Sequence, residues 1–194
     1  MQEWNLYKEI MLHEMDELEN EINLSISGYK LDKEGIKKFI NCNQYKSVDY
    51  IADDELLSLV EFSDIYRQQN KIVDQIEDLT NSNADRDLTI EPIIKKLKAS
   101  IRNELVQKFN DTISIVQQML HINYCSELSD RYSSNHNLKR YLIIIAPFHH
   151  AIPTHRRVHL ARLINQEEKN ISSSLPKVIN VQVKIVSLEN FAES

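Results

Sequence analysis

Apolar residues recur at steps of three and four along most of the first 120 residues, which is the spacing of one face of an α-helix. Each stretch carries a single apolar stripe that must be buried on another helix or on another chain. Gly28 is a plausible end to the first helix, and residues 80–87 form the clearest loop. The pattern predicts helices over 4–26, about 33–42 with Asp32 as its cap, Asp53 or Asp54 to Leu79, and Thr89 to Leu120.

The periodicity changes after Arg131. Residues 140–148, RYLIIIAPF, form a continuous apolar run of strand length, and residues 178–188, VINVQVKIVSL, alternate between apolar and polar positions. Between them, residues 154–169 have the spacing of a helix with Thr154 as its N-cap. A strand, a helix and a strand predict a β-α-β unit whose two strands lie side by side and parallel.

Together these patterns predict a mainly α fold. A helical bundle or rod of three to four helices occupies 1–130, and a small β-α-β head occupies 131–194. Strict heptads with charge pairing at their flanks are absent, which disfavours a two-stranded coiled coil. Two strands alone leave unpaired edges, so the sequence favours a C-terminal unit that associates with another copy or with a partner protein.

The composition removes several functional classes. Only two glycines occur, Gly28 and Gly35, so a P-loop, a dinucleotide-binding loop and a kinase phosphate loop are all excluded. Two distant cysteines, Cys42 and Cys125, support neither a disulfide framework nor a cysteine zinc finger. The N-terminal residues do not resemble a signal peptide, and no apolar run approaches eighteen residues. We therefore expect an intracellular protein, cytoplasmic or nuclear, without a membrane span or a cofactor.

Charge is distributed unevenly along the chain, whose net charge is −6. Residues 131–194 carry nine Lys and Arg against four Asp and Glu, and no acidic residue occurs from 131 to 166. The predicted head is therefore basic and the preceding 130 residues are strongly acidic. A basic head predicts an anionic partner, either an acidic protein surface or nucleic acid bound through residues 131–166.

Four of the seven histidines lie in residues 146–159, APFHHAIPTHRRVH, beside two arginines. One interpretation is simply the polar face of a surface helix. A second is a metal site built from His149, His155 and His159, although no carboxylate is nearby in sequence to orient a ligand. A third is an anion-binding surface, because cations in the first turn of a helix oppose its dipole until an anion joins them. Its predicted members are Lys139, Arg140, His155, Arg156, Arg157, His159 and Arg162.

A second candidate is the R-x4-H spacing formed by Arg131 and His136. It resembles the motif of HEPN-domain ribonucleases, although Tyr132 follows the arginine where that family usually has a polar residue. The resemblance implies that Arg131 and His136 of two subunits would cleave RNA without a metal. The competing interpretation of the same residues is a helix end followed by a polar loop.

The sequence thus favours a non-enzymatic interaction or scaffold subunit of an oligomer or larger complex, with the basic head contacting an anionic partner. The alternative is a metal-independent, HEPN-like ribonuclease that uses Arg131 and His136.

Overall fold

The structure is a computed structural model of the 194-residue chain. It describes residues 3–13, 15, 22–82, 90–122, 132, 138–146 and 153–193.

The described strands form one mixed sheet in the order β1-β2-β3-β4-β5-β6. The first four strands pair antiparallel, whereas β4, β5 and β6 are parallel neighbours. The strands are β1 (Lys8–Ile10), β2 (Ser27–Lys30), β3 (Tyr50–Ala52), β4 (Ser58–Ser63), β5 (Lys139–Ile145) and β6 (Val181–Ser187). In a mixed sheet of this kind, the carboxyl ends of β4, β5 and β6 lie at the same edge.

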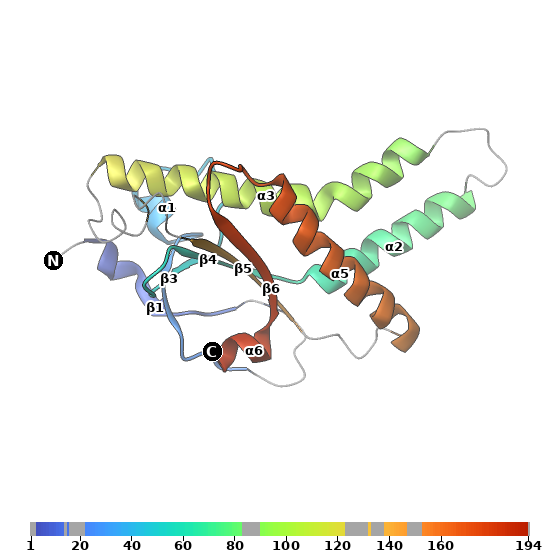
Figure 1. The fold of residues 1–194 in the computed structure, drawn as a ribbon, viewed down its shortest axis with the longest axis horizontal. Coiled ribbons are helices and arrows are strands. Elements are labelled where there is room, and N and C mark those ends of the chain that lie inside the picture. The colour runs from blue at the N-terminus through green and yellow to red at the C-terminus, as the bar shows by residue number, and fades with distance from the viewer. Residues whose placement is uncertain are drawn as a thin grey trace.

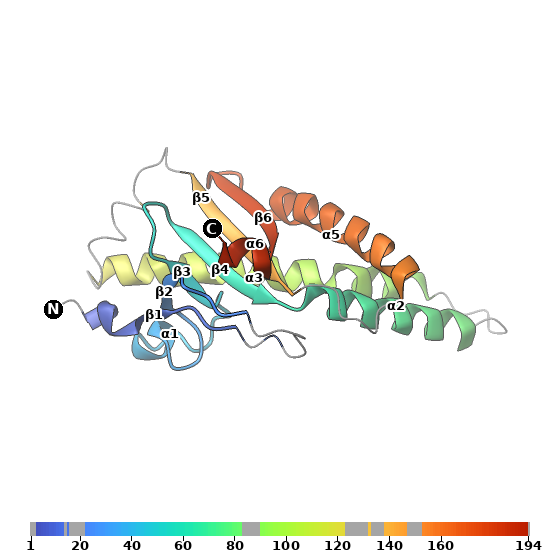
Figure 2. The ribbon, with the colours of Figure 1, turned by 90° about the horizontal axis from the view of Figure 1, so that it is seen from below.

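Helices fill the connections (Figure 1). Two long helices lie between β4 and β5 and form an antiparallel hairpin, and a third lies between β5 and β6 (Figure 2). The helices are η1 (Glu3–Tyr7), α1 (Ile36–Phe39), α2 (Ile65–Ser82), α3 (Glu91–His121), α5 (Thr154–Ser174) and α6 (Leu188–Ala192). Among the described helices, none combines the length and the apolar character that a membrane span requires.

Both faces of the sheet are covered by other elements, and a separate hydrophobic core lies on each face. Leu59 and Ile143 belong to the larger core beneath α2, α3 and α5. Their neighbours Val60 and Ile144 point the other way, into a smaller core that includes Leu188 and Phe191 of α6. The central strands are therefore buried on both sides, which explains their continuous apolar sequence.

The predicted mainly α fold is wrong, because residues 1–130 contribute four strands to the sheet. The stripe assigned to a helix over 4–26 combines side chains that enter different cores. Trp4 stacks on Tyr29 in the larger core, with ring centroids 3.5 Å apart, whereas Met11 packs in the smaller one. Gly28 lies in β2 rather than at a helix end, and a Cβ there would stand only 2.4 Å from Cε of Met11.

The helix predicted from Asp53 or Asp54 to Leu79 begins only at Ile65. The residues expected to form its first part are instead the turn after β3 and strand β4. Asp54 instead organises that turn, accepting hydrogen bonds from the N–H of Leu56 and the hydroxyl of Ser58. Asp32 also does not cap α1, whose N-cap is Gly35.

The later elements are confirmed. The long helix expected to end near Leu120 is α3. Strands β5 and β6 pair in parallel, and α5 connects them along the chain. The predicted cap is wrong, because Thr154 is the first helical residue of α5 and Pro153 occupies the N-cap. Because β4 pairs directly with β5, the predicted bundle and head share one sheet. At the β6 edge, Glu168 of α5 accepts a hydrogen bond from the N–H of Ile185 at 2.9 Å.

Candidate functional site

Glu61 is a carboxylate inside the apolar core. It lies in β4, and its side chain is 3% exposed. Its Oε1 accepts a hydrogen bond from Nζ of Lys108 on α3 at 2.5 Å, so one oxygen is paired with a charge. The other oxygen, Oε2, is buried and has no hydrogen-bond partner among the described residues. A buried carboxylate oxygen without a partner is costly, so this atom is a candidate ligand to something that joins the site.

Asp49 lies beside Glu61 on the neighbouring strand. Tyr50 is opposite Val60 in the β3–β4 register, so the next pair outward is Asp49 and Glu61. Oδ2 of Asp49 accepts a hydrogen bond from the N–H of Phe62 at 2.8 Å, which fixes its carboxylate next to the backbone that carries Glu61.

Helix α3 positions both acids. The hydroxyl of Thr112 accepts a hydrogen bond from the N–H of Val48 at 3.0 Å, which holds the chain just before Asp49. Lys108 stands one helical turn earlier and reaches Glu61. The long helix therefore holds Asp49 through its backbone and Glu61 through an ion pair.

The electrostatics of the cluster are unusual for carboxylates. Burial raises the pKa of Glu61 to about 8, and the charge of Asp49 adds to this effect while Lys108 opposes it. Burial also raises the pKa of Asp49, partly offset by the hydrogen bond from Phe62. Burial would lower the pKa of Lys108, but Glu61 outweighs it and the pKa of Lys108 is raised. A cation bound between the buried Glu61 and the half-buried Asp49 would stabilise the ionised form of both groups.

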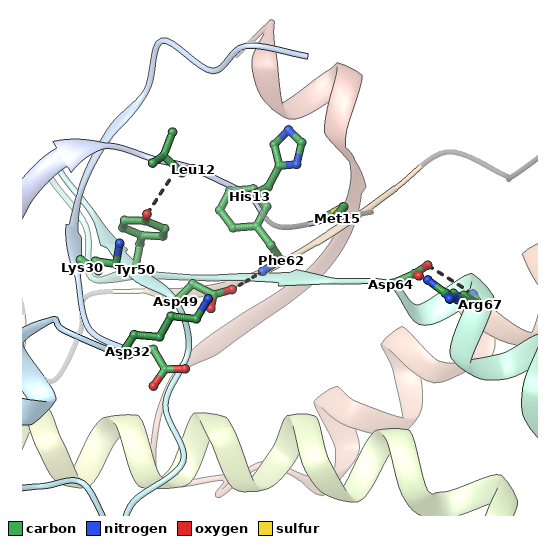
Figure 3. Close-up of a pocket in the computed structure, with 11 residues that line it drawn as sticks. Leu12, His13, Met15, Lys30, Asp32, Asp49, Tyr50, Phe62, Asp64 and Arg67 are labelled. Atoms are coloured by element: carbon green, nitrogen blue, oxygen red, sulfur yellow. Dashed lines mark hydrogen bonds between the residues drawn. The ribbon is translucent and has the colours of Figure 1, made fainter. Parts of the chain in front are cut away.

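Two hollows flank this cluster at the end of β4. A small cavity of about 110 Å³ is lined by Glu61, Glu104 and Lys108 among others, which leaves room for several water-sized ligands. A larger cleft of about 500 Å³ is lined by Asp49, and Figure 3 shows its side chains around the ends of β2 and β4. Phe62 and Asp64 line both hollows, so the two meet at the carboxyl end of β4. Ligands of open α/β sheets bind outside such strand ends.

The larger cleft has a mixed lining. Three carboxylates, three cations and the rings of His13, Tyr50 and Phe62 face it. The charged residues are Asp32, Asp49, Asp64, Lys30, Lys33 and Arg67. Burial would raise the pKa of Asp32, but the hydrogen bond from Lys37 and nearby charges lower it. Asp32 therefore keeps its negative charge close to Asp49.

The predicted anion-binding residues of α5 lie on a different part of the molecule. His155, His159 and Arg162 are exposed, and Arg157 is half-buried. Arg156 bridges to α2, where it donates to Oδ1 of Asp74 at 2.7 Å and to Oε2 of Glu77 at 3.1 Å. The negative partner of Arg156 in this structure is thus the chain's own second helix.

Lys139 and Arg140 are not brought to that surface. They begin β5, whereas α5 follows the opposite end of the same strand. Lys139 is buried, its Nζ lies 5.3 Å from the centroid of the Tyr132 ring, and burial lowers its pKa. Nη1 of Arg140 lies 3.7 Å from Oδ2 of Asp54.

Other predicted site residues lie outside the described part of the chain. They are Arg131 and His136 of the R-x4-H motif, and His149 of the predicted metal site. Within the described residues, no group of three or more His, Cys, Asp and Glu side chains is arranged to hold a metal. The cluster at Glu61 therefore offers at most two protein carboxylates to one ion.

Sequence reasoning missed Asp49, Glu61 and Lys108. The available signal was a single acid in the otherwise apolar run from Leu57 to Phe62, apart from Ser58. An acid at a position that a buried strand reserves for apolar side chains is expensive without a specific role. The predicted helix from Asp53 or Asp54 to Leu79 hides this signal, because Glu61 is not on the stripe of Leu56, Leu59 and Phe62.

Comparison with known proteins adds no relative: neither protein-family profiles, nor curated protein sequences, nor solved structures give a match to this chain.

Proposed function

We propose that the protein is a divalent-cation-dependent hydrolase of nucleic-acid phosphodiester bonds, with Asp49 and Glu61 as ligands of the cation and Lys108 beside them. The proposal rests on the buried, unpartnered Oε2 of Glu61, whose side chain lines the small cavity, and on the half-buried Asp49 opposite it in the register.

The donor set favours a hard cation. Carboxylate oxygens select Mg²⁺ or Mn²⁺ over softer metals. Mg²⁺ is commonly held by one or two protein carboxylates, with waters and substrate phosphates completing its shell. Two acids without a third ligand group therefore suit an ion that reaches its full shell only with a phosphate-bearing substrate.

The neighbouring cleft suits a nucleic acid. Lys30, Lys33 and Arg67 can approach phosphates, and the half-buried ring of Phe62 can stack on a base. The chain holds only two glycines and no phosphate-binding loop, so phosphate recognition falls to the cation and to these side chains.

The reaction is a hydrolysis without redox change. Water forms a P–O bond while the bond from phosphorus to the leaving oxygen breaks, and one proton passes from the water to the leaving group. A bound cation would acidify that water and neutralise charge on the phosphoryl oxygens. Asp49 and Glu61 would hold the ion, and the Lys108 ammonium would offset negative charge that develops beside them.

Cleavage of end-labelled oligonucleotides tests the proposal. Single- and double-stranded DNA and RNA are incubated with the protein in Mg²⁺, in Mn²⁺ and in EDTA. Cleavage should require the cation, and Glu61→Gln or Asp49→Asn should reduce it by at least about 100-fold, more than the loss of an outer-shell partner.

The matched control is Asp53→Asn. Asp53 is a partly exposed carboxylate after the other end of β3, where it pairs with Lys8 at 2.5 Å. Its substitution should leave cleavage intact. Mn²⁺ binding followed by electron paramagnetic resonance gives a readout independent of turnover. Equal binding by wild type and by the Asp49→Asn/Glu61→Gln protein would show that Glu61 and Lys108 form only a structural ion pair.

The ribonuclease with Arg131 and His136 stays a prediction, and the same assay separates it. That enzyme would cut RNA in EDTA, would lose activity in His136→Ala and would be indifferent to Glu61→Gln.

The predicted scaffold role also stays a prediction, but one of its reasons is removed. The two C-terminal strands do not stand alone, since β5 pairs with β4.

A further inference from the structure

The hairpin formed by α2 and α3 extends beyond the sheet (Figures 1 and 2). In α2 the last buried residue is Ile72, and in α3 the first is Ile101. The hairpin segments beyond them, residues 73–82 and 90–100, bury none of their side chains fully. They are nevertheless rich in apolar residues, namely Val73, Ile76, Leu79, Ile90, Ile93, Ile94 and Leu97. Ile76 and Leu97 pack partly against the larger core, but no described element buries Ile93 or the exposed sides of the other residues.

The uncovered apolar surface forms a shallow groove along one side of this outer hairpin. Leu79 of α2 and Ile93 and Leu97 of α3 line it, and Ile93 is 50% exposed. The α2 residues that Arg156 of α5 contacts are Asn70, Asp74 and Glu77, none of which lines the groove. Helix α5 therefore does not fill the groove.

Charge on the outer hairpin is divided between its helices. The last turns of α2 carry Asp74, Glu77 and Asp78, whereas the first turns of α3 carry Lys95, Lys96 and Lys98. Asp78 lies on the rim of the groove, and Lys96 is exposed one turn from Ile93. A surface with an acidic helix beside a basic helix is complementary to a copy of itself turned by 180°.

We propose that this groove is a homodimer interface, in which the outer hairpins of two chains form a four-helix bundle. Leu79, Ile93 and Leu97 of each copy form its centre, and Asp78 of one copy faces Lys96 of the other. The proposal is independent of the phosphodiesterase function, because it uses none of Asp49, Glu61 or Lys108.

Sedimentation velocity over micromolar concentrations tests the apolar centre. Wild type should sediment as a dimer, and Ile93→Glu should weaken dimerisation at least about tenfold because a charge enters the buried centre. The control is Val158→Glu, since Val158 is 54% exposed on α5, away from the groove. A monomeric wild type, or a dimer that Ile93→Glu leaves intact, overturns the proposal.

A charge exchange tests the partner itself. Asp78→Lys and Lys96→Glu should each dissociate the dimer, because each places two like-charged pairs across the two-fold axis. Mixing the two variants, or combining both changes in one chain, should restore it. Both residues are exposed, so neither change should unfold the monomer. Restoration that fails in both arms would place the contact elsewhere or assign the groove to a different protein.

Discussion

The segment from His149 to His159 and the cluster around Glu61 are opposites. The first concentrates histidines and arginines in a short stretch, yet His155 and His159 are exposed on α5 and Arg156 pairs with α2. The second combines the buried Glu61 of β4, the half-buried Asp49 just before β3 and a lysine from a distant helix. The contrast teaches that burial of reactive groups indicates a site better than their density in sequence.

The largest difference between the two regions is expected in the cleavage rates of their variants. Glu61→Gln should lower cation-dependent cleavage by at least about 100-fold. The double variant His155→Ala/His159→Ala should leave the rate within about twofold, because both imidazoles are exposed and remote from the cleft. Initial rates on one labelled oligonucleotide give both numbers. Loss of cleavage in the histidine variant alone would reverse the assignment.

Stability gives the next largest difference. Lys108→Ala should destabilise the protein by about 1–3 kcal/mol at neutral pH, because Oε1 of Glu61 loses its hydrogen-bond donor in the core. Adding Glu61→Gln to Lys108→Ala should recover part of that loss. Urea unfolding followed by circular dichroism measures both. If Lys108→Ala unfolds at the wild-type midpoint, the hydrogen bond from Lys108 to Glu61 does not stabilise the fold.

A pH series sharpens the same point. The pKa of Glu61 is about 8 in the folded protein against an ordinary 4.5, so between these values the folded state holds a proton that the unfolded chain has released. The free energy of unfolding should therefore fall as pH rises from about 4.5 to about 8. Glu61→Gln should remove this part of the slope. Urea midpoints in EDTA test it, and identical slopes would show that Glu61 stays ionised.

The smallest effect is expected at Arg156. Arg156→Ala breaks its bonds to Asp74 and Glu77, but all three groups lie at the surface. The urea midpoint should barely change, and the small difference should vanish in high salt. A large loss of stability would show that α5 depends on this bridge.

The elements predictable from sequence were those with one clear period. Residues 91–121 have apolar positions at helical spacing over many turns, and they form a helix as predicted. Residues 181–187 alternate between apolar and polar positions, and they form a strand as predicted. Strand β4 was mistaken for helix because both its faces are buried. Its alternation disappears, and Leu56, Leu59 and Phe62 fall by chance at steps of three. The strands β1, β2 and β3 are too short to show any period.

The candidate site was unpredictable for a related reason. Asp49 and Glu61 meet only because β3 and β4 pair, and Lys108 is 47 positions from Glu61 in the chain. Spacing within a short stretch of sequence cannot reveal contacts between residues this far apart in the chain. The basic residues on α5 that predict anion binding lie close together in sequence, but the pairing of Arg156 with the acids of α2 depends on packing between remote helices.

The hydrogen bond from the N–H of Ile185 to Glu168 protects the β6 edge of the sheet from pairing with another strand. Strand β6 is the last of the sheet, and its outward amide at that point is already taken by an acid from α5. A second chain that paired with β6 would have to displace this carboxylate and place its own backbone beside a negative charge. Templated fibril growth along that margin is thereby discouraged.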